Sequence, residues 1–291
     1  MLVFVSDENS SDTSKPFFGI DPLTDGVPAG GVPFLFDLFK DFEASHAAAA
    51  YLNGDVISDL SETADGAFSI SSAPQTITSN ATFGGADFSA VTAVGNAVRA
   101  PIGALNDIND GSQYFAVAAW VVLPSSADWN TSAALAPFFC STAGATGYAT
   151  PEADICTLAF LGTGAGNITA RRQTNGATVT QMNLTVSAAG RGRLALVMFW
   201  RNAAGIGLRV KTSLTDQTVT GAVGAANVTD FSNAQARWGV TTSFTPAVDI
   251  AKLGNWSLCK GWIENLQVSG RDPTTVFDAE YARILARFPS L

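Results

Sequence analysis

Two carboxylates one residue apart are the first feature of the sequence that could do chemistry. Glu152 and Asp154 would lie on one face of a strand, because successive side chains of a strand point to opposite faces. Cleavage of a glycosidic bond uses two carboxyl groups roughly 5–10 Å apart. Pro151 directly precedes the pair, however, and this favours a solvated loop that enters a strand over a catalytic pair.

The single histidine and the three cysteines suggest no other catalytic group. His46 precedes a run of alanines, and the sequence contains no Gly-x-Ser-x-Gly elbow for a histidine-assisted nucleophile. The cysteines are Cys140, Cys156 and Cys259, and their wide spacing favours neither a disulfide framework nor a zinc site. We therefore expect free, mostly buried thiols and no enzymatic activity.

Calcium is the one ion that the sequence suggests. Residues 106–111 read Asn-Asp-Ile-Asn-Asp-Gly and offer hard oxygen ligands in a tight turn, with Asp107, Asn109 and Asp110 as candidate ligands. No glutamate follows at the position that an EF-hand loop requires. The alternative is an ordinary Asn/Asp turn before the next strand. No other cofactor is expected.

Two aromatic side chains in predicted loops are candidates for stacking on a sugar ring. Trp129 and Tyr148 fall in the long loops expected near residues 125–136 and 141–153, so they are the candidate glycan-binding residues. Tryptophans within predicted strands are expected in the core: Trp120, Trp200 and Trp262. The pattern assigns Trp238 and Trp256 to neither group.

Composition and charge narrow the class of protein. Only 14% of the 291 residues are charged, against about 25% in an average globular chain, while 47% are hydrophobic. Small and hydroxylated residues are abundant, which is typical of many short strands joined by turns. The net charge of −9 and the scattered basic residues make nucleic acid an unexpected partner.

The start of the chain lacks the features of a secretory signal. Residues 1–5 are apolar but carry no basic n-region, and an acidic pair follows at Asp7 and Glu8. The apolar run at residues 114–123 is too short for a membrane span. We expect no membrane insertion and folding in a cytoplasm.

Residues 1–60 are predicted to form an attachment segment. Prolines and glycines recur through the first 34 residues and forbid a helix there, yet apolar side chains are interleaved with them. We expect an extended arm that packs against its own domain or a neighbouring subunit, through these residues: Phe17, Phe18, Ile20, Phe34 and Phe36. A short helix is predicted over residues 36–52, capped by Asp37.

Residues 61–291 are predicted to form an antiparallel β-sandwich. Alternating or fully apolar segments separated by Gly, Asn and Asp turns predict strands at 67–71, 76–83, 114–123, 155–161, 168–172, 178–186, 194–201, 206–212, 217–220, 237–241 and 262–268. A helix closes the chain, since Asp272 is a capping residue, Pro273 suits the first turn, and Phe277, Tyr281 and Ile284 repeat at helical spacing.

The order of these parts resembles the concanavalin A-like domains of the laminin-G type. The resemblance covers roughly residues 65–290 and is carried by segments 81–88, 114–121, 194–211 and 261–268, the last followed by a short helix. It implies a jelly-roll sandwich that binds glycans or proteins or serves as a structural module. The hydrolases of that fold carry Glu-x-Asp-x-Glu on one strand, and the third carboxylate is missing after Asp154.

Three classes of function follow. A non-enzymatic structural or adhesion protein of a phage particle (tail fibre, spike, baseplate or head decoration) fits an apolar arm, free cysteines and the absence of secretion features. Its partners would be other virion proteins and copies of itself, with a trimer favoured. The alternative is a free bacterial carbohydrate-binding, lectin-like module. A cell-surface glycan is a further partner in both. The third class is a polysaccharide hydrolase or lyase. Deletion of residues 2–34 is expected to abolish incorporation into the particle and to spare folding.

Overall fold

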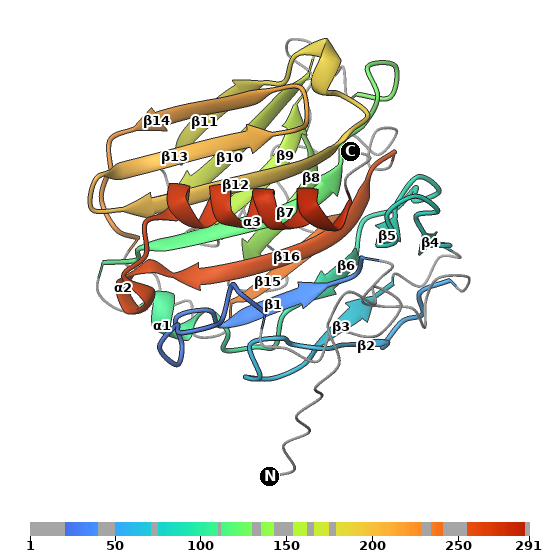
Figure 1. Ribbon diagram of the computed structural model, residues 1–291. Coiled ribbons are helices and arrows are strands. Elements are labelled where there is room, and N and C mark those ends of the chain that lie inside the picture. Colours follow the sequence, from blue (N-terminus) through green and yellow to red (C-terminus); the bar gives the residue numbers. More distant parts are fainter. Residues whose placement is uncertain are drawn as a thin grey trace.

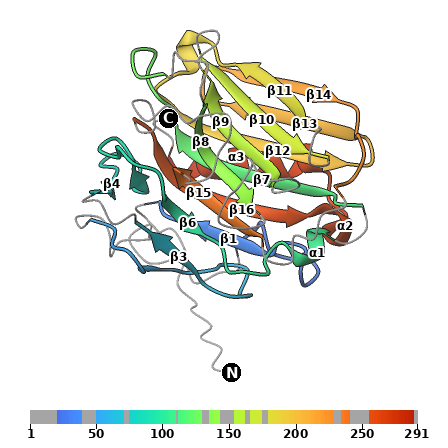
Figure 2. The same cartoon turned by 180° about the vertical axis from the view of Figure 1, so that it is seen from behind.

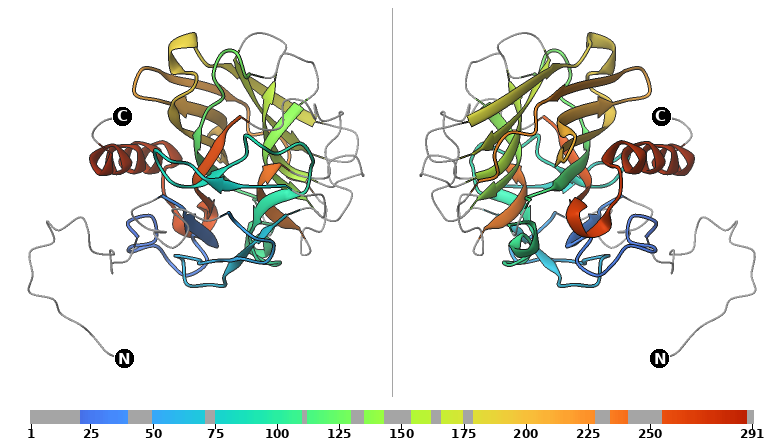
Figure 3. Two further views of the ribbon diagram at one scale, coloured as in Figure 1. Left: turned by 90° about the vertical axis from the view of Figure 1, so that its right-hand side faces the viewer. Right: turned by 90° about the vertical axis from the view of Figure 1, so that its left-hand side faces the viewer.

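The chain folds into two antiparallel sheets stacked face to face, with one long helix on the outer side. The computed structural model describes residues 21–39, 50–70, 75–109, 112–129, 135–142, 154–161, 166–174, 179–227, 234–240 and 255–288. Figure 1 shows the long helix α3 (Pro273–Arg287) lying across the front sheet, and the end-on views of Figure 3 show it outside both layers. The predicted all-β sandwich with a C-terminal helix is confirmed.

The first sheet, called sheet 1, contains eight strands. Their order is β14-β13-β12-β7-β16-β5-β4, and β1 also pairs with β16. Their bounds are β1 Phe34–Asp37, β4 Thr78–Ser79, β5 Ala86–Asp87, β7 Phe115–Val122, β12 Leu194–Asn202, β13 Gly205–Lys211, β14 Asp216–Gly221 and β16 Ser257–Asn265. Strand β16 pairs with β7 on one side and with β1 and β5 on the other. It therefore connects the N-terminal strands to the rest of sheet 1.

The second sheet, called sheet 2, also contains eight strands, in the order β11-β10-β9-β8-β15-β6-β3-β2. Their bounds are β2 Val56–Ile57, β3 Gly66–Ser69, β6 Asn96–Arg99, β8 Leu135–Thr142, β9 Asp154–Leu161, β10 Asn167–Gln173, β11 Val179–Thr185 and β15 Gln235–Val240. Short helical turns complete the described elements: α1 Asn106–Asn109, η3 Ala188–Gly190 and α2 Leu266–Ser269.

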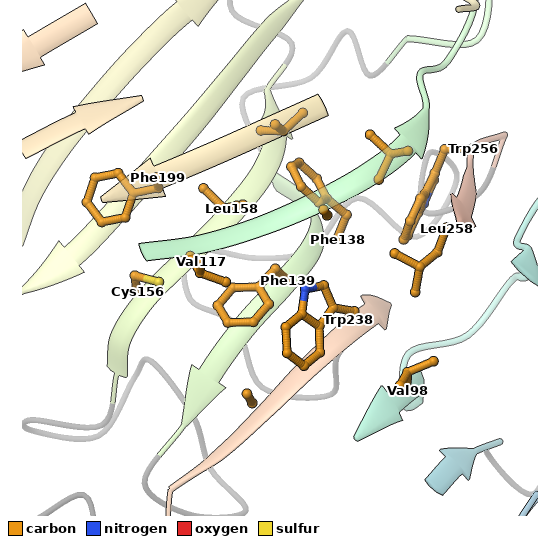
Figure 4. Packing of buried hydrophobic residues seen from close by; sticks show 14 of the residues in the cluster. Val98, Val117, Phe138, Phe139, Cys156, Leu158, Phe199, Trp238, Trp256 and Leu258 are labelled. Carbon is orange, nitrogen blue, oxygen red and sulfur yellow. The ribbon is translucent and has the colours of Figure 1, made fainter. Parts of the chain in front are cut away.

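Aromatic side chains fill the space between the sheets. Trp238 of sheet 2 lies edge-on to Phe36 of sheet 1, with ring centroids 5.1 Å apart, and its indole N–H donates to the carbonyl of Ala118 at 3.1 Å. Figure 4 shows Trp238 beside Phe139, and Phe138 on the side of Trp256. Gly261, opposite Phe36, leaves room for this packing, because a Cβ there would lie 2.7 Å from the Phe36 ring.

A second apolar layer lies between sheet 1 and α3. Trp120 of β7 stacks on Tyr281 of α3 with ring centroids 5.5 Å apart, and Phe277 and Ile284 are buried in the same cluster. The helix begins as predicted: the Asp272 carboxylate accepts the backbone N–H of Thr275 at 2.8 Å. Sheet 1 is therefore covered on both faces, which explains its nearly continuous apolar strands.

The N-terminal part of the chain differs from its prediction. Phe34–Asp37 is strand β1, not the start of a helix, because pairing with β16 buries all four of its residues. Phe34 and Phe36 are 0% exposed within the core, so they pack against their own domain, the first of the two alternatives, and their assignment to attachment to a neighbour is wrong. Strand β2 also precedes the boundary predicted near residue 60 and pairs with β3. Phe17, Phe18 and Ile20, and residues 40–49 of the predicted helix, lie outside the described residues.

Strand β8 was not predicted: its two ends fell in the loops expected near residues 125–136 and 141–153, and residues 137–140 were assigned to no element. Leu135–Thr142 contains Pro137, and a proline has no N–H to donate to a ladder. The register with β9 shifts between Pro137 and Phe139, so the proline lies at an irregularity of the pairing where this loss is tolerated. At the other end of the chain, β16 starts five residues before the predicted strand, at Ser257, and Asn265 ends it by capping α2. Among the described helices, none is long and apolar enough to cross a membrane.

Candidate functional site

The outer face of sheet 2 carries a row of side chains contributed by eight strands. Directly opposed residues of antiparallel strands share a face, and the printed registers place these in one line: Val56, Ala67, Arg99, Arg237, Cys140, Thr157, Arg171 and Gln181. Their sequence neighbours Val98, Ala170 and Trp238 belong to the core between the sheets, so the row points outward. Figure 2 looks onto this side of the molecule.

Three arginines dominate this line, and we call Arg99, Arg171 and Arg237 the arginine row. Each side chain is half-buried, and in each the Nε atom is buried without a hydrogen-bond partner. No ion pair to any of the three is found among the residues that the structure describes. Burial and the neighbouring Arg237 lower the pKa of Arg99. Among the described residues, no carboxylate pairs with the arginine row. Cys140 and Thr157, between Arg237 and Arg171, are 0% and 1% exposed, so the middle of the row is covered.

A second pair of arginines has a different, structural role at one end of the sandwich interior. Arg201 donates to the carbonyls of Val223 and Gly224 at 3.1 and 2.9 Å, and to those of Ser112 and Gln113. Arg172 donates to the carbonyl of Ala225 at 2.6 Å, and burial together with Arg201 lowers the pKa of Arg172 to about 10. These bonds fix residues 222–227, which have no regular secondary structure of their own.

A buried charge cluster lies on the other side of the molecule, under α3. Lys260 is 0% exposed, and its Nζ lies 2.9 Å from Asp21, 3.2 Å from Glu280 and 3.8 Å from Asp37. Arg283 and Arg287 complete the set by pairing with Glu280 and Asp37. Burial alone would raise the pKa of Asp21, but Lys260 and Arg283 lower it overall. With three cations and three carboxylates, this cluster is balanced and links the N-terminal segment to the sheet and the helix.

A groove of about 380 Å³ lies beside this cluster, between residues 22–23 and the first half of α3. Its walls are mainly apolar and include Leu23, Val276 and Ala279. Its charged side chains are Glu280 and Arg283, which pair with each other at 2.8 Å, Asp272, which caps α3, and Arg271, which pairs with Glu264 at 2.7 Å. The Nη2 atom of Arg271 is nevertheless buried without a hydrogen-bond partner.

The predicted glycan-binding tryptophan is buried. Trp129 is 1% exposed, lies edge-on to Phe160 with ring centroids 5.3 Å apart, and has the guanidinium of Arg191 5.7 Å from its ring centre. The backbone N–H of Trp129 donates to the carbonyl of Ser125 and closes the loop. The ring faces inward, against Phe160. The prediction that Trp129 offers a ring face to a sugar is therefore wrong. Tyr148 lies outside the described residues.

The predicted calcium ligands are only partly described. Asp107 and Asn109 fall in the single helical turn α1, which follows a turn at residues 102–105, and Asp110 lies outside the described residues. Within the described ranges, no group of three or more His, Cys, Asp or Glu side chains is placed to hold a metal ion. Calcium binding stays a prediction.

The remaining candidates for chemistry are resolved in part. Glu152 and His46 lie outside the described residues, while Asp154 begins β9 opposite Thr142. All three cysteines are free and buried, as predicted. Burial, with Asp37 and Asp87 nearby, raises the pKa of the Cys259 thiol well above its usual value. Trp120, Trp200 and Trp262 are buried, which confirms their assignment to the core.

The fold defines the class of protein as an antiparallel β-sandwich with an appended helix. No family model matches the sequence, and no curated protein matches it. Among solved structures, it is similar to the binding domain of botulinum neurotoxin serotype C1, with 11% identity over 81% of this chain and 48% of that one, and a TM-score of 0.43.

Two further solved structures show the same level of similarity. A structure described as a receptor binding domain has a TM-score of 0.49 and 11% identity, over 76% of this chain and 49% of that one. The sialidase of Trypanosoma rangeli has a TM-score of 0.40 and 12% identity, over 86% of this chain and 33% of that one. This chain spans less than half the length of each of the three.

Proposed function

We propose that the protein is a non-enzymatic carbohydrate-binding sandwich whose binding face is the outer side of sheet 2. The arginine row carries this proposal. A guanidinium has five N–H donors in a fixed plane, and sugars present many oxygen acceptors. Three such groups with buried, unpartnered Nε atoms are held on neighbouring or nearby strands of one rigid sheet. Because the Nε atoms are buried, a ligand would accept from the exposed part of each half-buried side chain.

The surroundings of the row support a binding role. Gln181 and Asn183 on β11 are exposed, point to the same face, and add amide donors and acceptors at its margin. The outer face of sheet 1 is occupied by α3, whereas no described helix packs on the outer face of sheet 2. Because strands hold side chains more rigidly than loops do, little conformational entropy is lost when these groups bind.

Replacement of all three arginines tests the proposal. The variant Arg99→Gln/Arg171→Gln/Arg237→Gln is expected to lose glycan binding on an array and in calorimetry, by about tenfold for each charge-assisted hydrogen bond removed. Arg193→Gln is the matched control, because Arg193 is exposed and lies in a turn away from the row. Thermal unfolding of each variant separates lost binding from lost folding. Unchanged binding by the triple variant would refute this site.

The protein's place on a phage particle is a second part of the proposal. Three free, buried cysteines suit folding in a reducing host cytoplasm, where disulfides do not persist. Val56, on the edge strand β2 of sheet 2, and Leu52, four residues before it, are 63% and 64% exposed. An exposed apolar edge is a site for pairing with another chain, so we propose contact there with other virion proteins or copies of this chain.

A pair of charged substitutions tests this edge. Leu52→Glu/Val56→Glu is expected to convert an oligomer, by preference a trimer, to monomers, since like charges would face each other across the contact. Light scattering after size-exclusion chromatography gives the mass. Wild-type protein that is monomeric at all concentrations would count against self-association through this edge.

A further inference from the structure

The open part of the outer face of sheet 2 lies between Arg237 and the edge strand β2. Arg237, Arg99, Ala67 and Val56 are directly opposed on β15, β6, β3 and β2, which follow one another in the sheet (Figure 2). The two arginines are half-buried, and Ala67 and Val56 are exposed. Cys140, on the other side of Arg237, is 0% exposed. A ligand at the two arginines therefore has open surface only on the side of the sheet edge.

Arg99 and Arg237 form a pair of like charges at one end of this open surface. Their Cα atoms lie about 5 Å apart, because the two residues are directly opposed. Like charges in this position destabilise a sheet, and no ion pair or hydrogen bond to either guanidinium is found among the described residues. Burial and the charge of Arg237 lower the pKa of Arg99. An anion between the two guanidinium groups would offset their repulsion and accept hydrogen bonds from both.

The surface next to the pair is apolar. Ala67 lies one strand from Arg99 and Val56 lies two strands away, which is about 5 and 10 Å at the usual strand spacing. Val56 is 63% exposed, and the small side chain of Ala67 leaves room above β3. A sugar ring has C–H groups on its faces and hydroxyl groups at its rim. A ring that carries a carboxylate therefore matches this surface, with the carboxylate at the pair and a C–H face on Ala67.

We propose that this surface binds one acidic sugar, a uronic acid at the end of a glycan, with its carboxylate between Arg99 and Arg237 and its ring over Ala67 toward Val56. This inference rests on the proposed carbohydrate-binding function and names the class of sugar. A uronic acid has the required form, because its carboxylate is attached to the ring itself. The site ends at Arg237 and needs no contact with the covered residues of the row.

Ligand-observed NMR titration at low salt tests the class of sugar. The probes are methyl glucuronide, its neutral counterpart methyl glucoside, and acetate, which carries the carboxylate without the ring. We expect the glucuronide to bind about tenfold more tightly than either of the others, because only the glucuronide uses both the arginine pair and the apolar surface. Its advantage over the glucoside should shrink as salt is raised, because the additional contact is ionic.

Ala67→Glu tests the position of the anion. The new carboxylate would lie directly opposite Arg99 and take the place of the sugar's carboxylate, so the glucuronide should bind about tenfold more weakly. The same variant should raise the midpoint of thermal unfolding by about 1–2 °C, because it adds a cross-strand ion pair beside two opposed cations. Ala67→Gln is the matched control: it has nearly the same size without the charge, so it should weaken the glucuronide less and not raise the midpoint.

Removal of the pair tests the same position from the other side. Arg99→Gln/Arg237→Gln should abolish the preference for the glucuronide over the glucoside. Arg193→Gln should keep that preference, because Arg193 is exposed in a turn away from the row.

The outcomes that oppose the proposal are distinct from one another. Equal binding of the glucuronide and the glucoside overturns the acidic class while the carbohydrate-binding function stands. Acetate that binds as tightly as the glucuronide overturns the role of the ring and leaves a site for a small anion. A preference that survives in Arg99→Gln/Arg237→Gln, or in Ala67→Glu, overturns the position of the site. No binding of any glycan defeats the proposed function itself.

Discussion

Lys260→Met should lower the free energy of unfolding by about 3–5 kcal/mol, the usual cost of removing one partner from a buried ion cluster. Among the described residues, Lys260 is the one cation that contacts Asp21, Asp37 and Glu280 together, and its substitution leaves three buried carboxylates with two cations. Urea unfolding followed by tryptophan fluorescence measures the change.

Lys211→Met is the matched control for this prediction. Lys211 also pairs with two carboxylates, Asp216 at 3.2 Å and Asp278 at 3.3 Å, but it is 25% exposed and its partners are more so. Water screens such pairs, so its loss should cost only about 0–1 kcal/mol. Similar costs for the two variants would mean that the cluster under α3 contributes no more than a surface pair.

Phe36→Ala should also be severe, with a loss of about 3–5 kcal/mol, the range for a buried phenylalanine. Phe36 is 0% exposed and fills the space over Gly261 between β16 and Trp238. Ile102→Ala is the control; Ile102 lies in a turn and is 70% exposed, so the change should alter stability by no more than about 0.5 kcal/mol. Thermal or urea unfolding measures both.

This prediction also tests whether the N-terminal segment belongs to the domain. A removable arm would allow Phe36→Ala to unfold like the wild type. Leu23, Val32 and Phe34 are buried as well, so truncation through residue 34 is now expected to destabilise the sandwich rather than spare it. Wild-type stability of either variant would restore the earlier interpretation of a detachable segment.

The sequence predicted the strands whose signal is local. Alternation or continuous apolarity between clear turns identified β7, β9 to β14 and the helix α3, because each of these has its own periodic pattern and its own caps. The prediction failed for β1, where a Phe-Leu-Phe run beside an alanine-rich segment resembled a helix start. Its strand conformation depends on β16, more than two hundred residues later, and tertiary pairing of this kind overrides local propensity.

The candidate site was missed for a related reason. Arg99, Arg171 and Arg237 are scattered in the sequence, and each one alone reads as an ordinary polar position on a strand. Only the pairing order β6-β15-β8-β9-β10 brings them into line, and that order is not sequential. Loop position, by contrast, suggested Trp129, although its side chain is needed by the core. A strand-order prediction combined with the inward or outward alternation would have found the row.

The position of β16 has a consequence for biosynthesis. Strand β1 finds its partner only when β16, more than two hundred residues later, has been made. Until then β7 also lacks its neighbour on that side, and both strands present open backbone edges. Sheet 1 therefore cannot close until β16 has been made, so nascent chains of this protein should depend on chaperones for longer than a fold built from sequential hairpins.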